Sequence, residues 1–272
     1  MGVSWTILMD TANSHGWMIK YITEFFGTMF LIILGNGAVA NVELKGTKGF
    51  ASGWMTIALG YGMGVAIPSL MFGNISGSHI NPAFTLGLAI NNMFPWMHVA
   101  QYIAAQFLGA MVGQLIVYAV HKPYYDLTTE KNAILGTFST IDNVNSCFYG
   151  FLSEFFSSFV LFFGALGITK LFFGVQQTNA GFHAGSLEIG HLALGFLVMV
   201  LVASMGGTTG PGLNPARDLG PRILHAILPL KNKGDSKWWY AWVPILAPIL
   251  ASIIAVALFK LIYEELAYKQ LV

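Results

Sequence analysis

The segment GPGLNPARDLGPR, residues 210–222, places two charged side chains in a chain that is otherwise strongly apolar. Arg217 and Asp218 are neighbours within it, and Glu24 and Glu154 lie inside two long hydrophobic stretches. Ionisable groups in such surroundings are costly and mark functional sites by default. Adjacent residues on a helix point about 100° apart, so the two charges cannot easily neutralise each other. We therefore expect Arg217 to donate hydrogen bonds into a polar lane and Asp218 to bond its surroundings or a neighbour such as Arg222.

Two Asn-Pro-Ala motifs could supply further hydrogen-bond donors. They consist of Asn81, Pro82, Ala83, Asn214, Pro215 and Ala216. Asparagine is among the best helix N-caps, and proline suits the first helical turn, so each motif predicts a helix start. The apolar stretches that follow are too short to span a membrane. Two helix N-termini that meet would create a fixed positive potential of about half a charge each, which should repel cations and hydronium.

Composition indicates a membrane protein. Of 272 residues, 55% are hydrophobic and 9% are charged, against about 25% charged in an average soluble domain. A hydrocarbon core takes about 20 helical residues. Stretches of suitable length occupy residues 18–40, 51–72, 97–120, 148–173, 188–207 and 239–262. We predict an all-α membrane protein with six transmembrane helices and no large soluble domain.

Several other classes are disfavoured by the sequence. Cys147 is the only cysteine, so neither an intramolecular disulfide nor a thiolate metal site can form. A net charge of +1 argues against nucleic-acid binding. Histidines and carboxylates show no metal-ligand spacing, and no nucleophile stands with a base. We expect no cofactor, no metal and no enzymatic activity.

The chain contains an internal repeat. YITEFFGTMFL from Tyr21 resembles FLSEFFSSFVL from Phe151, and SGSHINPAF resembles TGPGLNPAR at nearly the same offset. We predict one channel domain over residues 1–272 with halves at about 18–120 and 148–262. Because each half has three spans, the halves should be inverted relative to each other, with a shared site near the membrane midplane.

The segments before the two motifs are rich in glycine and should be extended. Their backbone carbonyls would lack helical partners, which is tolerated at membrane depth only inside protein or beside a water-filled cavity. The expected pore carbonyls are those of Gly77, Ser78, His79, Thr209, Gly210 and Gly212. Glu24 and Glu154 would accept backbone N–H bonds from these loops as scaffold. A lane of acceptors beside two donors suits a small, neutral, hydroxyl-bearing solute.

Together these motifs resemble the aquaporins, also called major intrinsic proteins, over nearly the whole chain. The resemblance implies a bundle of six helices and two re-entrant half-helices in two inverted repeats, one pore per chain, and usually a homotetramer. It also implies that the arginine after the second motif, Arg217, belongs to a narrow selectivity filter. Counting back from the two asparagines, as the family pattern requires, adds Tyr61, Val202 and Pro211.

The filter departs from both common patterns of the family. Water-selective members usually have histidine where Val202 stands, and glycerol-conducting members usually have tryptophan, glycine and phenylalanine at the first three positions. Other features favour the glycerol-conducting branch: Asp218 after the filter arginine, Arg222 four residues on, Pro244 with Ile245 in the last span, and the loop LGTFST from Leu135.

The resulting hypothesis is a passive channel for glycerol and similar polyols, with water, that excludes protons and ions. A wider filter with an arginine could instead accept small undissociated acids such as lactic acid, hydrogen peroxide, urea or dihydroxyacetone. A proton-coupled transporter would use Glu24 and Glu154, and an intramembrane enzyme is the remotest alternative.

Orientation gives conflicting signals. With six spans both termini share a side of the lipid bilayer. Fewer lysines lie on that side (Lys20, Lys170, Lys260, Lys269) than on the other (Lys45, Lys48, Lys122, Lys131, Lys231, Lys233, Lys237). The positive-inside rule therefore predicts outward-facing termini. The resemblance implies cytoplasmic termini in the plasma membrane, and we give it more weight.

Overall fold

A computed structural model describes residues 15–171 and 185–262 of the chain; Lys269 lies outside these residues. All regular elements in the described residues are helical. The helices are α2 (Trp17–Glu43), α3 (Trp54–Ser76), α4 (Pro82–Ile90), η1 (Trp96–His98), α5 (Val99–Leu127), α6 (Lys131–Gly136), α7 (Cys147–Leu166), the π-helical turn η2 (Gly167–Leu171), α8 (Gly185–Ser204), α9 (Pro215–Ile227) and α10 (Val243–Lys260).

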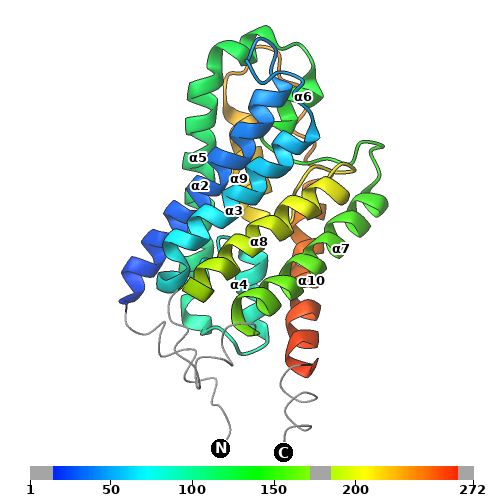
Figure 1. The fold of residues 1–272 in the computed structure, drawn as a ribbon. Helices are drawn as coiled ribbons and strands as arrows, with labels where there is room; N and C mark the ends of the chain where they lie inside the picture. The colour runs from blue at the N-terminus through cyan, green and yellow to red at the C-terminus, as the bar shows by residue number, and fades with distance from the viewer. Residues whose placement is uncertain (1–14, 172–184, 263–272) are drawn as a thin grey trace, which may run out of the picture.

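Five helical segments within the described part are long and apolar enough to cross a membrane: Trp17–Glu43, Trp54–Ser76, Trp96–Leu127, Cys147–Thr169 and Val243–Lys260. Helix α8 provides a shorter apolar segment, Ile189–Ser204, and coincides with the predicted span at 188–207. Each predicted span thus corresponds to one helix. Figure 1 shows these helices running side by side as one bundle, so the prediction of an all-α membrane fold is confirmed.

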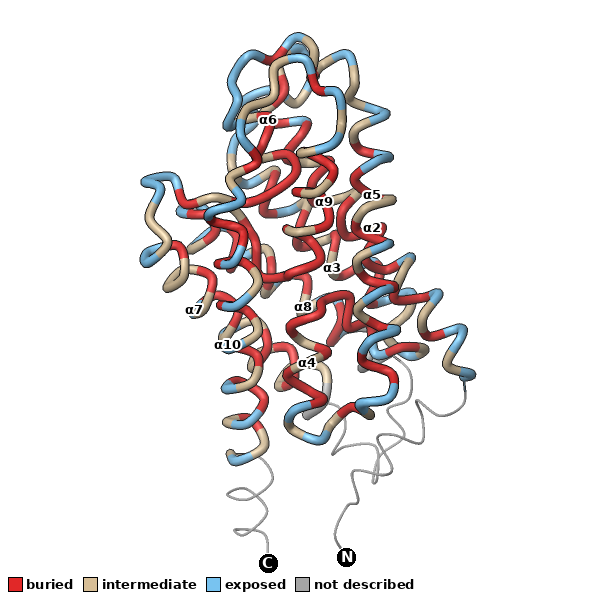
Figure 2. Tube along the Cα trace, turned by 180° about the vertical axis from the view of Figure 1, so that it is seen from behind, coloured by how far each residue is buried: buried red, intermediate tan, exposed pale blue. Residues whose placement is uncertain are grey.

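The bundle has an apolar exterior. Large hydrophobic side chains on the outward faces of different helices are exposed, among them Met18 (70%), Phe156 (54%), Phe196 (49%) and Leu250 (45%). Figure 2 shows that the interior of the bundle is buried: α9 and the loops before α4 and α9 are almost wholly in the buried class. Such a surface is stable only in contact with lipid or other apolar protein.

Two short helices begin at the Asn-Pro-Ala motifs. The Oδ1 atom of Asn81 accepts the Ala83 N–H at 3.0 Å, and Oδ1 of Asn214 accepts the Ala216 N–H at 3.0 Å, so both asparagines are N-caps with proline as the first helical residue. At 1.5 Å per residue neither α4, with 9 residues, nor α9, with 13, can cross the roughly 30 Å core. Figure 1 places them in opposite halves of the bundle.

Glycines allow the helices to approach closely. A Cβ atom added at Gly113 of α5 would lie 2.6 Å from the carbonyl oxygen of Met29 in α2, and one at Gly62 of α3 would lie 2.8 Å from the carbonyl oxygen of Gly195 in α8. No side chain fits at these distances. These contacts bring α2 against α5 and α3 against α8.

A lysine covers the carboxyl end of each short helix. Lys233 Nζ donates to the carbonyl oxygens of Ala226 (2.7 Å) and Leu228 (2.8 Å) at the end of α9. Lys260 Nζ donates to the carbonyl oxygen of Asn91 (2.9 Å) directly after α4. The last carbonyls of a helix lack intrahelical donors and carry partial negative charge, so a cation there stabilises the helix.

Replacing Lys233 with methionine should lower the midpoint of thermal unfolding in detergent. A cation at a helix C-terminus contributes about 0.3–2 kcal/mol, and the variant leaves the carbonyls at the end of α9 without that donor. The exposed Lys231 provides the matched control. An equal shift in the Lys231→Met protein would mean that charge near this loop, and not the cap, stabilises the fold.

Candidate solute pathway

The loops that precede α4 and α9 are joined by reciprocal hydrogen bonds. Asn81 Nδ2 donates to the carbonyl oxygen of Leu213 (2.9 Å), and Asn214 Nδ2 donates to the carbonyl oxygen of Ile80 (2.7 Å). Each asparagine therefore caps its own helix through Oδ1 and holds the opposite loop through Nδ2. The N-termini of the two short helices are thereby brought together, as the repeat pattern leads one to expect.

The residue before each asparagine adopts a left-handed backbone conformation. Ile80 has φ 41° and Leu213 has φ 56°, a region in which a β-branched or bulky residue is strained. Their carbonyl oxygens are the acceptors of the asparagine amides that cross between the loops. The strained conformation thus accompanies the contact that joins the two halves.

Two buried carboxylates hold these loops. Glu24 accepts the N–H groups of His79 at Oε1 (2.8 Å) and Ile80 at Oε2 (2.7 Å). Glu154 accepts the N–H of Leu213 at Oε2 (2.6 Å) and the Thr209 hydroxyl at Oε1 (3.0 Å). Both side chains point at loop backbone, and neither is among the residues that line the central cavity.

A central cavity of about 80 Å³ lies where the loops meet. This is several times the roughly 10–15 Å³ that one water requires. The cavity is lined by Leu31, Tyr61, Val65, Ser78, His79, Ile80, Asn81, Phe84, Leu161, Phe162, Ala165, Leu194, Val198, Val202, Pro211, Gly212, Leu213, Asn214 and Arg217. The four residues expected in a filter and both asparagines share this one space.

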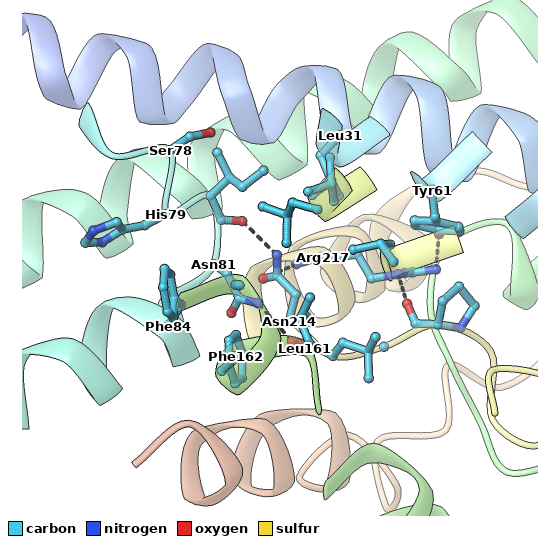
Figure 3. A pocket seen from close by; sticks show the side chains of 18 of the residues that line it. Leu31, Tyr61, Ser78, His79, Asn81, Phe84, Leu161, Phe162, Asn214 and Arg217 are labelled. Carbon is cyan, nitrogen blue, oxygen red and sulfur yellow. Dashed lines mark hydrogen bonds between the residues drawn. The ribbon is translucent and has the colours of Figure 1, made fainter. Parts of the chain in front are cut away.

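The cavity has two chemically different sides. Helices α2, α3, α7 and α8 contribute aliphatic and aromatic side chains such as Leu31, Val65, Leu161 and Val198, whereas the loops and α9 contribute the polar groups. Figure 3 shows Arg217 beside Tyr61 at one end, Ser78 and His79 at the other, and Asn81 with Asn214 between them. A solute in the cavity would meet hydrogen-bonding groups on one side and hydrocarbon on the other.

The expected pore carbonyls are not equivalent. Ser78, His79 and Gly212 line the cavity, whereas Gly77, Thr209 and Gly210 are not among its lining residues. The carbonyl oxygen of Thr209 accepts the Ile141 N–H (2.9 Å), and that of Gly210 accepts the Gly212 N–H (2.9 Å). In the loop before α9, two of the expected pore carbonyls are thus already occupied by backbone hydrogen bonds.

Arg217 lies at the cavity wall with only 2% of its surface exposed. Its Nε donates to the carbonyl oxygen of Pro211 (2.8 Å) and its Nη1 to that of Phe138 (2.9 Å). Its Nη2 donates to the Tyr61 hydroxyl. A guanidinium has five N–H groups, so one hydrogen on each terminal nitrogen is left for a solute.

Asp218 turns away from the cavity and pairs with Arg222. The Arg222 Nε and Nη2 atoms both donate to the carboxylate, at 2.8 and 3.0 Å, and both side chains are fully buried. The backbone N–H and hydroxyl of Thr140 also donate to Asp218 Oδ2, each at 2.7 Å. The loop that carries Phe138 and Thr140 is therefore fixed to α9 at the same place as Arg217.

The histidine next to the first motif is held within the protein. His79 Nδ1 lies 3.1 Å from the Thr85 hydroxyl oxygen, and its ring packs edge-on against Phe94. Within the described residues, no group of three His, Cys, Asp or Glu side chains could hold a metal ion. The polar residues that line the cavity are Tyr61, Ser78, His79, Asn81, Asn214 and Arg217.

Comparison with known proteins gives the same assignment as the geometry. A family model described as major intrinsic protein matches residues 11–259. The chain belongs to the major intrinsic protein family. It is an integral, multi-pass membrane protein with the aquaporin fold.

Several members of the family are similar to this chain over nearly their full length. A glycerol facilitator-aquaporin of Lactococcus lactis subsp. cremoris is 58% identical, covering 91% of this chain and 98% of that protein. A glycerol uptake facilitator protein-like 5 of Lactiplantibacillus plantarum is 47% identical with the same coverage. The X-ray structure of the aquaglyceroporin from Plasmodium falciparum has a TM-score of 0.77 at 28% identity and covers 94% of this chain and 98% of that one.

Sequence reasoning missed two residues that contact the expected filter of this family member, Asn36 and Phe138, and a third, Gln114, that bonds Asn36. Asn36 accepts a hydrogen bond from Tyr61, Gln114 bonds Asn36, and the carbonyl oxygen of Phe138 accepts from Arg217. Asn36 and Gln114 stand alone as polar residues in the apolar runs ILGNGAV and GAMVGQLIV. An uncharged polar residue inside a predicted span was the available signal for both.

Replacing Asp218 with asparagine should strongly destabilise the protein. Arg222 would keep a buried charge without its partner, a change that costs about 3–5 kcal/mol. Thermal unfolding in detergent measures the effect, and the Asp218→Leu/Arg222→Met double variant should recover part of the loss. The exposed pair Lys45–Glu130 is the control, and Glu130→Gln should leave the unfolding midpoint nearly unchanged. A double variant no more stable than Asp218→Asn would contradict this interpretation.

Proposed function

We propose that this protein is a passive channel that conducts glycerol and similar polyols, together with water, and excludes protons and ions. The observation that carries the proposal is the two-sided cavity, in which one row of donors and acceptors faces a hydrocarbon wall. A polyol has hydroxyl groups along one edge of a short carbon chain, so it can use both walls at once. The relatives named as glycerol facilitators support the same solute.

Four cavity residues form the proposed selectivity filter. Arg217 donates to solute hydroxyls through its two remaining terminal hydrogens. Tyr61 and Val202 shape the apolar side, and Pro211 forms the remaining wall with a ring smaller than phenylalanine. The filter would therefore admit solutes wider than water while keeping one fixed charged donor.

At the junction of the loops the two asparagines take over donation. The bonds described use one N–H of each amide, so each Nδ2 has a second hydrogen for a passing solute. The carbonyls of Ser78, His79 and Gly212, which line the cavity, would accept hydrogen bonds from the solute. The positive ends of α4 and α9 raise the energy of any cation there. Passage requires no covalent step, so the protein is not expected to be an enzyme.

The proposed assembly and location follow the family. We propose one channel domain over residues 1–272, built from inverted halves at about 18–120 and 148–262. The exposed apolar helix faces fit lipid and neighbouring subunits, in a homotetramer in the plasma membrane with cytoplasmic termini.

A second solute class is favoured by the filter itself. Val202 and Pro211 make the wall beside Arg217 apolar, which suits small undissociated acids such as lactic acid, and also hydrogen peroxide or urea. A proton-coupled transporter is disfavoured, because both oxygens of Glu24 and of Glu154 already accept hydrogen bonds away from the cavity.

The direct test is osmotic shrinkage and re-swelling of proteoliposomes in glycerol, followed by stopped-flow light scattering. We expect glycerol to enter much faster than into empty liposomes, without an imposed proton gradient. Parallel runs with lactic acid at low pH, urea and water rank the solutes. Glycerol flux equal to that of empty liposomes would refute the main proposal, and uphill uptake driven by protons would refute a passive channel.

Replacing Arg217 with valine should raise the proton leak of the same vesicles by about tenfold or more. One unit charge a few ångströms from the lane contributes more than about 1.4 kcal/mol at an effective dielectric constant of about 20. A pH-sensitive dye inside the vesicles measures the leak, with Lys231→Met as the control. Unchanged leak and unchanged solute selectivity would remove Arg217 from the filter.

Replacing Pro211 with phenylalanine should narrow the lane beside Arg217. We expect the permeability to the larger solutes, relative to water, to fall severalfold, because the larger ring occupies space next to the guanidinium. Pro211→Ala is the size control and should leave that ratio at or above its original value. Equal ratios in the two variants would show that this wall does not limit solute size.

A further inference from the structure

A chain of buried polar groups leads from the filter into the wall of the bundle. The Tyr61 hydroxyl bonds Asn36 Oδ1 (2.5 Å), and Asn36 Nδ2 bonds Gln114 Oε1 (2.6 Å). Asn36 and Gln114 are 0% exposed and come from α2 and α5. Neither is among the residues that line the central cavity, so neither can touch a solute there.

The donors and acceptors in this chain have only one consistent direction. Asn36 Oδ1 can only accept, so the single hydroxyl hydrogen of Tyr61 points to it. The lone pairs of the hydroxyl oxygen are then left for Arg217 Nη2, which can only donate. Tyr61 therefore offers no hydroxyl hydrogen to the cavity.

The orientation of the Asn36 amide is also fixed. Its Nδ2 atom faces two acceptors, Gln114 Oε1 at 2.6 Å and the carbonyl oxygen of Phe138 at 3.3 Å. A flipped amide would place its oxygen against both acceptors and its hydrogens against the Tyr61 hydroxyl. Because the carbonyl oxygen of Phe138 can only accept, it keeps the Asn36 oxygen directed at Tyr61, and Gln114 Oε1 provides a second acceptor for the same amide.

These bonds close a ring around the guanidinium. Arg217 Nη1 and Asn36 Nδ2 both donate to the carbonyl oxygen of Phe138. Arg217 Nη2 donates to the Tyr61 hydroxyl, which in turn donates to Asn36 Oδ1. Both terminal nitrogens of the arginine are therefore held from the side that faces α2. Only the hydrogens directed away from this ring can reach the lane.

We propose that Asn36 and Gln114 are positioning residues that fix the Tyr61 hydroxyl and, through it, the Arg217 guanidinium, and thereby set the selectivity of the filter. This inference rests on the proposed function, because it assigns a role to groups behind the same filter. Without the anchor, the guanidinium can swing into the lane, which obstructs a polyol more than it obstructs water.

A purely structural role for these two residues gives a different expectation. Polar side chains that bond across membrane helices hold the helices together, and the contact between Asn36 and Gln114 would do this without Tyr61. Loss of such a contact would lower stability and reduce the flux of all solutes equally. The ratio of glycerol to water permeability separates the two roles, because it does not depend on the amount of folded protein.

The experiment is a double-mutant cycle in proteoliposomes with Asn36→Leu, Tyr61→Phe and the double variant. Hydrogen bonds to charged groups are among the stronger ones in proteins, so we expect the glycerol-to-water ratio to fall about threefold or more in each single variant. Because Asn36 acts through the Tyr61 hydroxyl, the double variant should match Tyr61→Phe alone. The proposal would be overturned if the fall in the glycerol-to-water ratio in the double variant were the product of the two single falls. It would also be overturned if Asn36→Leu left that ratio unchanged.

Thr28→Val is the matched control for the cycle. Thr28 lies on the same helix as Asn36, is equally buried, and donates only to the carbonyl oxygen of Glu24 in its own helix (2.8 Å). The glycerol-to-water permeability ratio of the Thr28→Val variant should equal that of the unmodified protein. A control that shifts as much as Asn36→Leu would show that any polar loss in α2 disturbs the filter.

A structure of the Asn36→Leu protein provides a readout that needs no solute. The contact between the Tyr61 hydroxyl and Arg217 Nη2 should be lost, and the Arg217 guanidinium should be displaced toward the lane, with a longer contact from Nη1 to the carbonyl oxygen of Phe138. An unmoved Tyr61 and Arg217 would overturn the positioning role. If the unmodified protein passes no glycerol, the proposed function fails, and this structure still decides whether Asn36 positions the arginine.

Discussion

The whole arrangement depends on holding two helix N-termini against each other in the interior of a membrane protein. The partial positive charges of α4 and α9 repel, and the loops before them leave irregular backbone in a low-dielectric setting. The crossed bonds of Asn81 and Asn214 and the carboxylates Glu24 and Glu154 hold the two loops together. Lysines stabilise the far ends of both helices. Five charged side chains are buried around that one junction: Glu24, Glu154, Arg217, Asp218 and Arg222.

The polar residues near the cavity divide into those that face the lane and those that hold them. Arg217 presents donors to the cavity, whereas Asp218 and Arg222 fix α9 to the loop that carries Phe138. The carbonyl of Phe138 in turn orients Arg217. The filter is therefore built from residues far apart in the sequence, and its geometry depends on side chains that no solute reaches.

The sequence was sufficient for the fold because its strongest signals are local. Long apolar runs predict the spans, and asparagine followed by proline predicts both short helices, which begin where expected. Repeat symmetry also placed Glu24 and Glu154 at equivalent positions. The contacts of Asn36 and Gln114 could not be predicted, since helical spacing does not say which face of α2 meets α3 and which meets α5. The backbone hydrogen bonds that occupy the carbonyls of Thr209 and Gly210 could not be predicted either, because they depend on the loop conformation, which composition does not determine.

The crossed asparagine bonds have a consequence for how the chain is made. The Asn81 amide and the Ile80 carbonyl find their partners only in residues 213 and 214, far later in the order of synthesis. Until that part of the chain enters the membrane, the first loop has polar groups that nothing on its own side of the sequence satisfies. The junction is therefore completed only when the second loop arrives, so the first three spans cannot form the lane by themselves.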